Sequence, residues 1–394
     1  MKIEIVFYLF FLSIFVSGCS SDKQSREDLP SIDVRQDYPE KEIDLTKIAD
    51  VTYLHLSTES DDYLYGGSIS YVTQNTIVVG SANGVLFFSK DGKPKSRFNR
   101  RGQGPEEYTR VNQLMYDEAT DDVYISQHNR DYINVYSSEG EYKRRLNLAQ
   151  KNIDNQMVLF DDRSILVYDN SKFWQNISKK YSGDKTAFTE PVDSTFYLIS
   201  KTDGTVLEYI NLPNNNMDLS FSSGDDGFIF FGAPSFARVR KCPDGLFLYN
   251  PETDTVFLYR KDKSLTPYLH KKPLLRDLEP MLAMDICMNA GKFQFITVIR
   301  DLTNAGASST YYTRDKKSGE IFRQKIFLPD YKGKDFHIDS RVPNYYEKEY
   351  HFELDLIELK DAYRENRLSG KLKELVATLN EYEDNNVFVL VEFK

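Results

Sequence analysis

The chain has 394 residues, enough for one large hydrophobic core or two smaller ones. Acidic residues outnumber basic ones by 60 to 50, a net charge of −10, and no Lys/Arg cluster is interleaved with aromatic residues, so nucleic acid is excluded as an expected partner. The 27 tyrosines and 26 phenylalanines favour β-structure, because aromatic side chains suit pleated, half-buried surfaces.

The first feature along the chain is an apolar run, IVFYLFFLSIFV at residues 5–16, which leads through Ser17 and Gly18 to Cys19. A membrane-spanning helix needs about 20 apolar residues, so this shorter run indicates the core of a signal peptide. Small residues directly before a cysteine resemble the lipobox of bacterial lipoproteins, in which the signal is cut before the cysteine and the sulfur carries lipid. We therefore expect a signal peptide at 1–18 and a lipid tether on Cys19. The alternative is an ordinary signal peptide with a chance cysteine.

The next stretch is polar and shows no apolar period, which indicates a flexible leash at 19–42. A single domain is expected over 43–394. Ser20, directly after the cysteine, resembles the residue found in lipoproteins sorted to the outer membrane. We therefore expect a lipid-anchored protein of the cell envelope at the outer membrane, with its periplasmic or surface exposure left open.

Beyond the leash, the recurring pattern is a strand, a tight turn and another strand. Asp-Gly and related pairs supply the positive φ that tight hairpins demand. The expected turns lie at 91–92, 139–140, 203–204, 261–263 and 318–319. Alternating β-branched and aromatic residues predict further strands at 75–81, 121–126, 164–169, 245–250 and 292–300. A loose period with several strands per unit is the signature of β-propeller blades.

The segment GQGPEEYTRVNQLMYDEATDDVYISQHNRDYINVYSSEGEYKRRL, residues 102–146, resembles one repeat of the NHL-type β-propellers. More closely, the chain after the leash resembles the six-bladed β-propeller lipoproteins of Gram-negative bacteria. That resemblance includes VTYLHLST before the first blade, the G-x-G-P-E-E-Y corner and a helical tail before the last strand. It implies an all-β, six-bladed propeller with a short helical segment near the C-terminus. Ser126 and Gln127 stand where the repeat has an Asp, so no role of that Asp is carried over.

The corner GQGPE, residues 102–106, is open to interpretation as a phosphate cradle, an active-site loop or a turn in the fold. Glycines reach φ values closed to other residues, and a proline forbids helix at the residue before it. A phosphate loop opens a helix and carries Lys-Ser/Thr, whereas strand-like residues follow here. We therefore expect Gly102, Gly104 and Pro105 to form a structural turn between blades.

The sixth blade is expected from residue 336 onwards. Its helical part carries Leu372, Leu375, Val376 and Leu379 at steps of three and four residues, the spacing of one apolar helix face. The final strand, NNVFVLVEF, is expected to pair with a strand near 51–56 and close the ring, so that no bare edge remains.

No catalytic constellation can be assembled from the sequence. None of the five histidines stands at ligand spacing from another, and neither H-E-x-x-H nor G-x-S-x-G occurs; the histidines are His55, His128, His270, His337 and His351. Cys242 and Cys287 lack a C-x-x-C pattern, and we expect free thiols, with a disulfide as the alternative. We expect no catalytic residue, no metal and no cofactor.

One stretch interrupts the strand pattern: NSKFWQNISKKYSGDKTAF, residues 170–188, which carries the only tryptophan. Lys172, Phe173 and Trp174 are the candidate ligand-binding residues, because long loops on a rigid scaffold often bind ligands and aromatic rings stack on sugar faces. The alternative is that Trp174 packs under its own loop.

The function expected from the sequence is a non-enzymatic recognition or scaffold module. It would be tethered to the membrane by lipid and would bind a glycan, a peptide or an envelope protein. The alternative is a propeller enzyme, a lyase or hydrolase, with its site at the central channel, since fold alone does not determine function.

Overall fold

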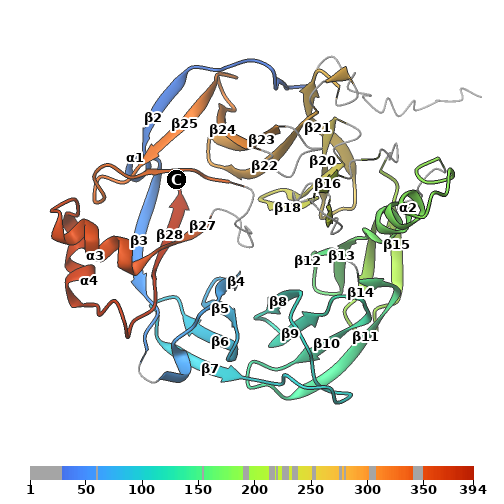
Figure 1. The fold of residues 1–394 in the computed structure, drawn as a ribbon, viewed down its shortest axis with the longest axis horizontal. Coiled ribbons are helices and arrows are strands. Elements are labelled where there is room, and N and C mark those ends of the chain that lie inside the picture. The colour runs from blue at the N-terminus through green and yellow to red at the C-terminus, as the bar shows by residue number, and fades with distance from the viewer. Residues whose placement is uncertain are drawn as a thin grey trace, which may run out of the picture.

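The computed structural model describes residues 29–58, 61–152, 155–189, 195–212, 218, 221–223, 230–232, 238–250, 254–274, 277–278, 281–300, 308–339 and 349–394. Six sheets stand around a central axis and form the predicted six-bladed β-propeller (Figure 1). The blades follow one another around the ring in chain order, except that the sixth combines strands from both ends of the chain.

Each of the first three blades is a four-stranded antiparallel sheet whose first strand lies nearest the axis. Blade 1 contains β4 (Ser68–Val72), β5 (Thr76–Ser81), β6 (Gly84–Ser89) and β7 (Pro94–Phe98). Blade 2 contains β8 (Gln113–Asp117), β9 (Asp122–Ser126), β10 (Arg130–Tyr136) and β11 (Tyr142–Asn152). Blade 3 contains β12 (Gln156–Leu159), β13 (Ser164–Tyr168), β14 (Phe196–Ser200) and β15 (Val206–Ile210). The middle strands are apolar on both faces because a neighbouring blade covers each face.

Blades 4 and 5 continue the ring. Blade 4 contains β18 (Val239–Cys242), β19 (Gly245–Asn250), β20 (Thr255–Arg260) and β21 (Leu265–Lys272). Blade 5 contains β22 (Leu282–Ala290), β23 (Phe293–Arg300), β24 (Ser308–Asp315) and β25 (Ile321–Phe327), with the short β26 (Asp335–Phe336) beside β25. All five strands predicted in the sequence and all five predicted turns are present in these first five blades.

Blade 6 closes the ring with the predicted pairing of the two chain ends. In its described part, β27 (Glu349–Leu354) pairs with β28 (Val387–Phe393), which pairs antiparallel with β3 (Ala49–His55). The register runs from Val387 opposite His55 to Phe393 opposite Ala49. Two helices, α3 (Leu356–Arg364) and α4 (Gly370–Thr378), lie between β27 and β28 and project from the ring (Figure 1). Leu372 and Val376 of the predicted apolar helix face are buried.

The expected leash at 19–42 is wrong for its second half. Two strands precede β3 in the chain. β1 (Ser31–Asp33) joins the outer edge of blade 4 and runs parallel to β21, and β2 (Glu40–Asp44) joins blade 5 and runs parallel to β25. Ile32 and Val34 have no exposed surface, and Val34 N–H donates to Lys272 O at 2.9 Å. Two apolar residues at a two-residue step are too short a pattern to reveal a strand, yet an open sheet edge accepts them. The short α1 (Leu45–Ile48) connects β2 to β3.

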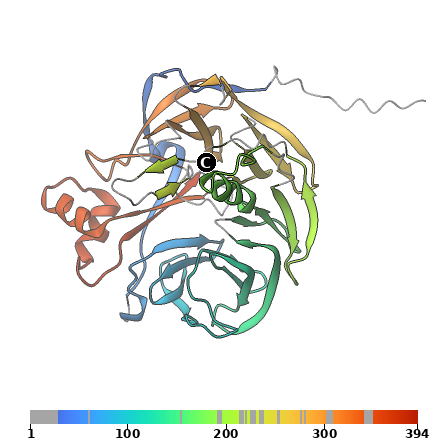
Figure 2. The same cartoon turned by 45° about the vertical axis from the view of Figure 1, so that its right-hand side comes forward.

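The two faces of the ring differ in their connections. The side of the ring on which the first strand of each blade begins is called the loop face; these first strands are β4, β8, β12, β18 and β22. Because neighbouring strands of a blade are antiparallel, the link between its second and third strands and the link to the next blade also lie on this side. We call the opposite side turn face. The loop face carries α2 (Ser171–Tyr181) and the hairpin of β16 (Phe221–Ser223) and β17 (Phe230–Gly232), and Figures 1 and 2 together place both on one side of the ring. The turn face carries the predicted tight turns at 91–92, 139–140, 203–204, 261–263 and 318–319.

Candidate functional site

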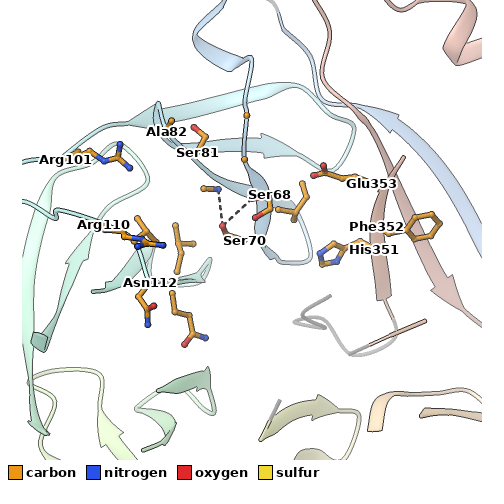
Figure 3. Close-up of a pocket in the computed structure, with 17 residues that line it drawn as sticks. Ser68, Ser70, Ser81, Ala82, Arg101, Arg110, Asn112, His351, Phe352 and Glu353 are labelled. Carbon is orange, nitrogen blue, oxygen red and sulfur yellow. Dashed lines mark hydrogen bonds between the residues drawn. The ribbon is translucent and has the colours of Figure 1, made fainter. Parts of the chain in front are cut away.

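A cavity of about 830 Å³ opens on the loop face where blades 1, 2 and 6 meet (Figure 3). Its walls come from the starts of β4 and β8, the end of β5, the corner between β7 and β8, and β27. We call it the loop-face pocket. Its volume falls within the range of about 300–1,000 Å³ in which proteins usually enclose small ligands.

The corner singled out in the sequence lies between two residues that line this pocket, Arg101 and Arg110, and it is firmly held by blade 2. Tyr136 Oη donates to Glu106 O at 2.9 Å, and Asn134 Nδ2 donates to Glu107 O at 3.1 Å. Thr109 N–H donates to Gln127 Oε1 at 2.8 Å. These bonds come from β10 and the residue after β9, so the corner keeps one conformation relative to the blade.

The predicted turn at Gly102, Gly104 and Pro105 is closed by Glu107 N–H, which donates to Gly104 O at 3.1 Å. The physical reason given for the glycines is wrong, because neither has a positive φ. Instead the Glu107 carboxylate folds over them, and its Oε2 accepts from Gly104 N–H at 2.7 Å. A Cβ on Gly102 would meet that carboxylate at 1.9 Å, so the glycine makes room for a side chain.

Two arginines flank this corner and line the pocket, Arg101 and Arg110. Both side chains are exposed. In the part of the chain that the structure describes, neither guanidinium has an ion-pair or hydrogen-bond partner. In Figure 3 both lie on the blade 2 side of the cavity, opposite His351 and Glu353 of β27. Two uncommitted cations at a hollow are a recognition feature for an anion.

His351 and Glu353 occupy successive same-side positions on β27, separated by Phe352, which points away from the cavity in Figure 3. Burial, together with the nearby Lys90 charge, lowers the pKa of His351 to about 3, so its imidazole is neutral at physiological pH. Burial raises the pKa of Glu353. The Glu353 carboxylate accepts from Tyr65 Oη at 3.4 Å, which ties it to the wall of blade 1.

The floor between these two sides is polar and made of small residues. Ser68, Ser70 and Ser81 contribute hydroxyl groups, and the glycines beside them expose backbone. Ser70 Oγ accepts from Gly80 N–H at 3.1 Å, which fixes its position. The pocket can therefore offer charged, hydroxyl and backbone groups to one ligand.

The ligand-binding residues predicted on the third blade are not part of this pocket. Lys172, Phe173 and Trp174 lie on α2, where a loop had been expected. Trp174 is partly exposed and packs edge-on against Phe173, with ring centroids 5.7 Å apart; Phe173 in turn contacts Phe188 at 5.8 Å. The ring thus packs largely against its own excursion, and the role of these three residues in binding stays a prediction.

The remaining candidates from the sequence lie elsewhere. Among the described residues, no group of three or more His, Cys, Asp or Glu could hold a metal ion. Cys242 and Cys287 are buried free thiols, as expected, and burial raises the pKa of both. Cys19 lies outside the described residues.

The sequence signal for the pocket was the position of the two arginines at the ends of the corner, RRGQGPEEYTR. The residues that the sequence reasoning missed as a group are Arg101, Arg110, Asn112, His351, Glu353 and Ser70. β27 is far from the corner in sequence, so only the closed ring brings the two walls together.

A second hollow, of about 470 Å³, lies on the turn face beneath blades 1 to 3. Three of its acidic side chains, Asp117, Glu118 and Asp161, have partners within the protein. Lys201 Nζ lies 2.7 Å from Asp117 Oδ2, and Glu118 Oε1 accepts from Thr76 Oγ1 at 2.5 Å. Asp161 Oδ1 accepts from Ser164 N–H at 2.7 Å. These charges support the blades and leave the loop-face pocket as the better candidate site.

A family model described as "Domain of unknown function (DUF4934)" matches residues 29–272. No curated protein matches the chain. In the described residues, no helix is both long and apolar enough to cross a membrane.

Among solved structures, the chain is similar to a protein from Bacteroides fragilis NCTC 9343 that is provisionally described as exported, with 16% identity, a TM-score of 0.60, and coverage of 93% of this chain and 99% of that one. A member of the duf4221 family from Bacteroides vulgatus shows 11% identity and a TM-score of 0.48, over 88% of this chain and 97% of the other. Virginiamycin B lyase from Staphylococcus aureus shows 11% identity and a TM-score of 0.32, over 69% and 97%. At these identities the likeness shows the fold alone, and the last two scores support no argument.

Proposed function

The chain belongs to the DUF4934 family, a domain of unknown function, and from its own site we propose that it is a recognition module of the cell envelope. In this proposal a lipid on Cys19 tethers the propeller to the outer membrane, and the loop-face pocket binds a glycan, a peptide or a partner protein without chemical change. The observation that carries the proposal is the pocket with two uncommitted arginines on a rigid corner.

The envelope location is supported by the apolar run at 5–16 followed by Ser17, Gly18 and Cys19. The Bacteroides fragilis protein described as exported shares the fold over nearly the whole chain, which agrees with a place in the envelope. Several acyl chains on one cysteine make a lasting anchor, because each buried CH₂ contributes about 0.8 kcal/mol.

Replacing Cys19 with Ser tests the tether. The variant is expected to leave the membrane fraction, while its folded domain is retained, because the change removes only the lipid attachment point. Fractionation of cells followed by immunoblotting measures this, with Ser20→Ala as the matched control that stays with the membranes. A C19S protein that still sediments with membranes after a salt wash contradicts the lipid anchor.

Filling the pocket tests recognition. Asn112 lines the pocket and its side chain is exposed, so Asn112→Trp places a large ring in the cavity. Lys317, also exposed, sits in a turn-face turn and gives the matched control Lys317→Trp. The full chain in detergent is screened against a panel of soluble glycans and peptides by thermophoresis.

The expected result is at least one ligand that wild type and K317W bind equally and that N112W does not bind. A panel without any bound ligand, or binding that N112W leaves unchanged, refutes recognition by this pocket.

One observation favours a second candidate, a propeller lyase or hydrolase at the channel. His351 lines the pocket, and histidine is the side chain that most often acts as a general acid or base. Under this candidate, a bound polysaccharide is shortened over time, and His351→Gln abolishes cleavage while retaining binding. Size-exclusion chromatography of the saccharide separates this candidate from recognition without chemistry.

A further inference from the structure

We propose that the loop-face pocket binds a carboxylate-bearing oligosaccharide, with Arg101 and Arg110 holding the sugar carboxylates and the serine-lined floor holding the hydroxyl groups. This inference rests on the proposed recognition function and names the ligand class of the same site.

The pocket presents positive charge on an acidic protein. The protein carries a net charge of −10, so the two arginines are not part of a generally basic surface. Of the two glutamates between them, Glu106 is exposed, and Glu107 turns inward to accept from Gly104 N–H at 2.7 Å. Glu353, on the opposite wall, accepts from Tyr65 Oη. The guanidinium groups therefore remain available, within the described part of the chain, for the carboxylate of a ligand.

The backbone between the two arginines is fixed by hydrogen bonds. An arginine pair binds an anion well only if little conformational freedom is lost on binding. The backbone between the two arginines is held at Glu106 O, Glu107 O and Thr109 N–H by side chains of blade 2. Tyr108, within the corner, is buried to 1% exposure, and its N–H donates to Arg100 O at 3.0 Å. The two cations are thus presented from a preorganised wall.

The other residues that line the pocket favour a saccharide over a peptide. The lining combines polar side chains, such as Ser68, Ser70 and Asn112, with apolar ones, such as Ile69, Val111 and Leu114 (Figure 3). A sugar carries both hydroxyl groups and apolar C–H faces, so it can use both kinds of contact. Ser68 and Ser70 of β4 and Asn112 before β8 offer hydrogen-bond donors and acceptors from two blades, which suits a ligand rich in hydroxyl groups. The volume of about 830 Å³ leaves room for more than one sugar ring.

The proposal is tested with the full chain in detergent and three defined probes: an oligogalacturonate, the same oligosaccharide with its carboxylates methyl-esterified, and a keratan sulfate oligosaccharide, which carries sulfate groups and no carboxylate. Titration calorimetry at low salt measures the Kd of each. We expect binding of the oligogalacturonate, with at least a tenfold weaker Kd after esterification, because the ester removes the charge and keeps the ring hydroxyls. We expect the sulfated probe to bind more weakly, because a sulfate ester is a much weaker base than a carboxylate and therefore a weaker hydrogen-bond acceptor for the guanidinium groups.

The variant R101A/R110A is expected to weaken oligogalacturonate binding at least tenfold. Its matched control is R130A/R163A, which removes the same charge from two exposed arginines that do not line the pocket. Because all four side chains are exposed, both variants are expected to fold, and the circular dichroism spectrum checks this.

Equal binding of the ester and the acid overturns the ligand class, as does an unchanged Kd in R101A/R110A. Preference for the sulfated probe, or no binding of any probe at millimolar concentration, overturns it as well. These failures are distinguishable from failure of recognition itself, because a peptide or neutral glycan that N112W releases still supports the recognition function.

Discussion

The loop face and the turn face of the propeller are built from the same blades but use their charges differently. On the turn face, Lys201 is paired with Asp117, and Glu118 holds Thr76, so the hollow there is part of the internal support of the fold. On the loop face, Arg101 and Arg110 have no such partners among the described residues. A charged side chain that stabilises the fold has an ion-pair or hydrogen-bond partner within the protein, whereas one that is available to a ligand has none.

The largest expected effect is on the turn face. Lys201→Met removes one partner of an ion pair whose side chains are only 9% and 15% exposed, and it leaves Asp117 charged and unpaired. We expect the free energy of unfolding to fall by about 2–4 kcal/mol in urea denaturation. Arg110→Ala, the loop-face counterpart, is expected to change it by less than about 0.5 kcal/mol. Similar losses for the two variants contradict the distinction between the faces.

The next effect concerns pH and belongs to the wall of the pocket. The folded-state pKa of His351, about 3, lies below its unfolded value, so its contribution to stability is complete above about pH 6.5 and is lost as the pH falls towards the folded value. The unfolding free energy is expected to drop by up to about 1.4 kcal/mol per pH unit between pH 6 and 4. The Lys90–Glu349 pair, at 2.5 Å, lies beside it and supplies the positive charge.

His351→Gln is the variant that isolates this contribution, since it keeps a polar side chain of similar length. Denaturation curves at several pH values are expected to show a flatter profile for His351→Gln than for wild type. Parallel profiles locate the acid sensitivity in other groups and remove His351 from the explanation.

A smaller effect compares glycines on the two faces. Gly140, in a turn-face turn, has a φ of 82°, and a Cβ there would lie 2.4 Å from Phe98 Cβ. Gly140→Ala is expected to cost about 1–3 kcal/mol. Gly104→Ala, in the loop-face corner, is expected to cost less than about 1 kcal/mol, because its φ is ordinary and the nearest atoms belong to the flexible Glu107 side chain. An equal cost at both positions shows that the corner is as constrained as the turn.

The smallest expected effect is at Trp174 on α2. Because the ring is partly exposed and packs mainly against Phe173, Trp174→Ala is expected to lower the unfolding free energy by about 1 kcal/mol, below the 3–5 kcal/mol typical of a core tryptophan. As the only tryptophan in the chain, it reports its own surroundings by fluorescence. Emission that iodide quenches only in part agrees with this geometry; emission fully protected from iodide places the ring in the interior.

The sequence predicted the turn face better than the loop face, for a physical reason. Tight turns depend on the φ angles of one or two residues, so pairs such as Asp91-Gly92 and Glu139-Gly140 predict them from local sequence. The predicted turn without glycine is also present, and Lys263 takes a φ of 66° there. The loop face depends on contacts between distant segments. Arg101 and Arg110 were visible, but their opposite wall, His351 and Glu353, could not be placed without the closed ring.

The helix α2 was missed although a local signal was present. Phe173, Ile177 and Tyr181 follow one another at four-residue steps, the spacing of one helix face. The surrounding strands and the expectation of a binding loop outweighed this pattern. For β1, by contrast, Ile32 and Val34 gave too short an alternation, and the partner strand β21 lies in a blade that no local pattern connects to it.

The first three strands of the described chain also impose an order on synthesis. β1 pairs with β21, β2 with β25 and β3 with β28, so none of these strands can pair until a much later part of the chain is present. Blades 1 to 3 contain only strands that follow one another along the chain, and they can form as the chain emerges. Of the three, β3 remains unpaired longest, and any product truncated before residue 387 lacks the strand that joins β3 to the ring. The ring therefore closes only in a chain that includes β28.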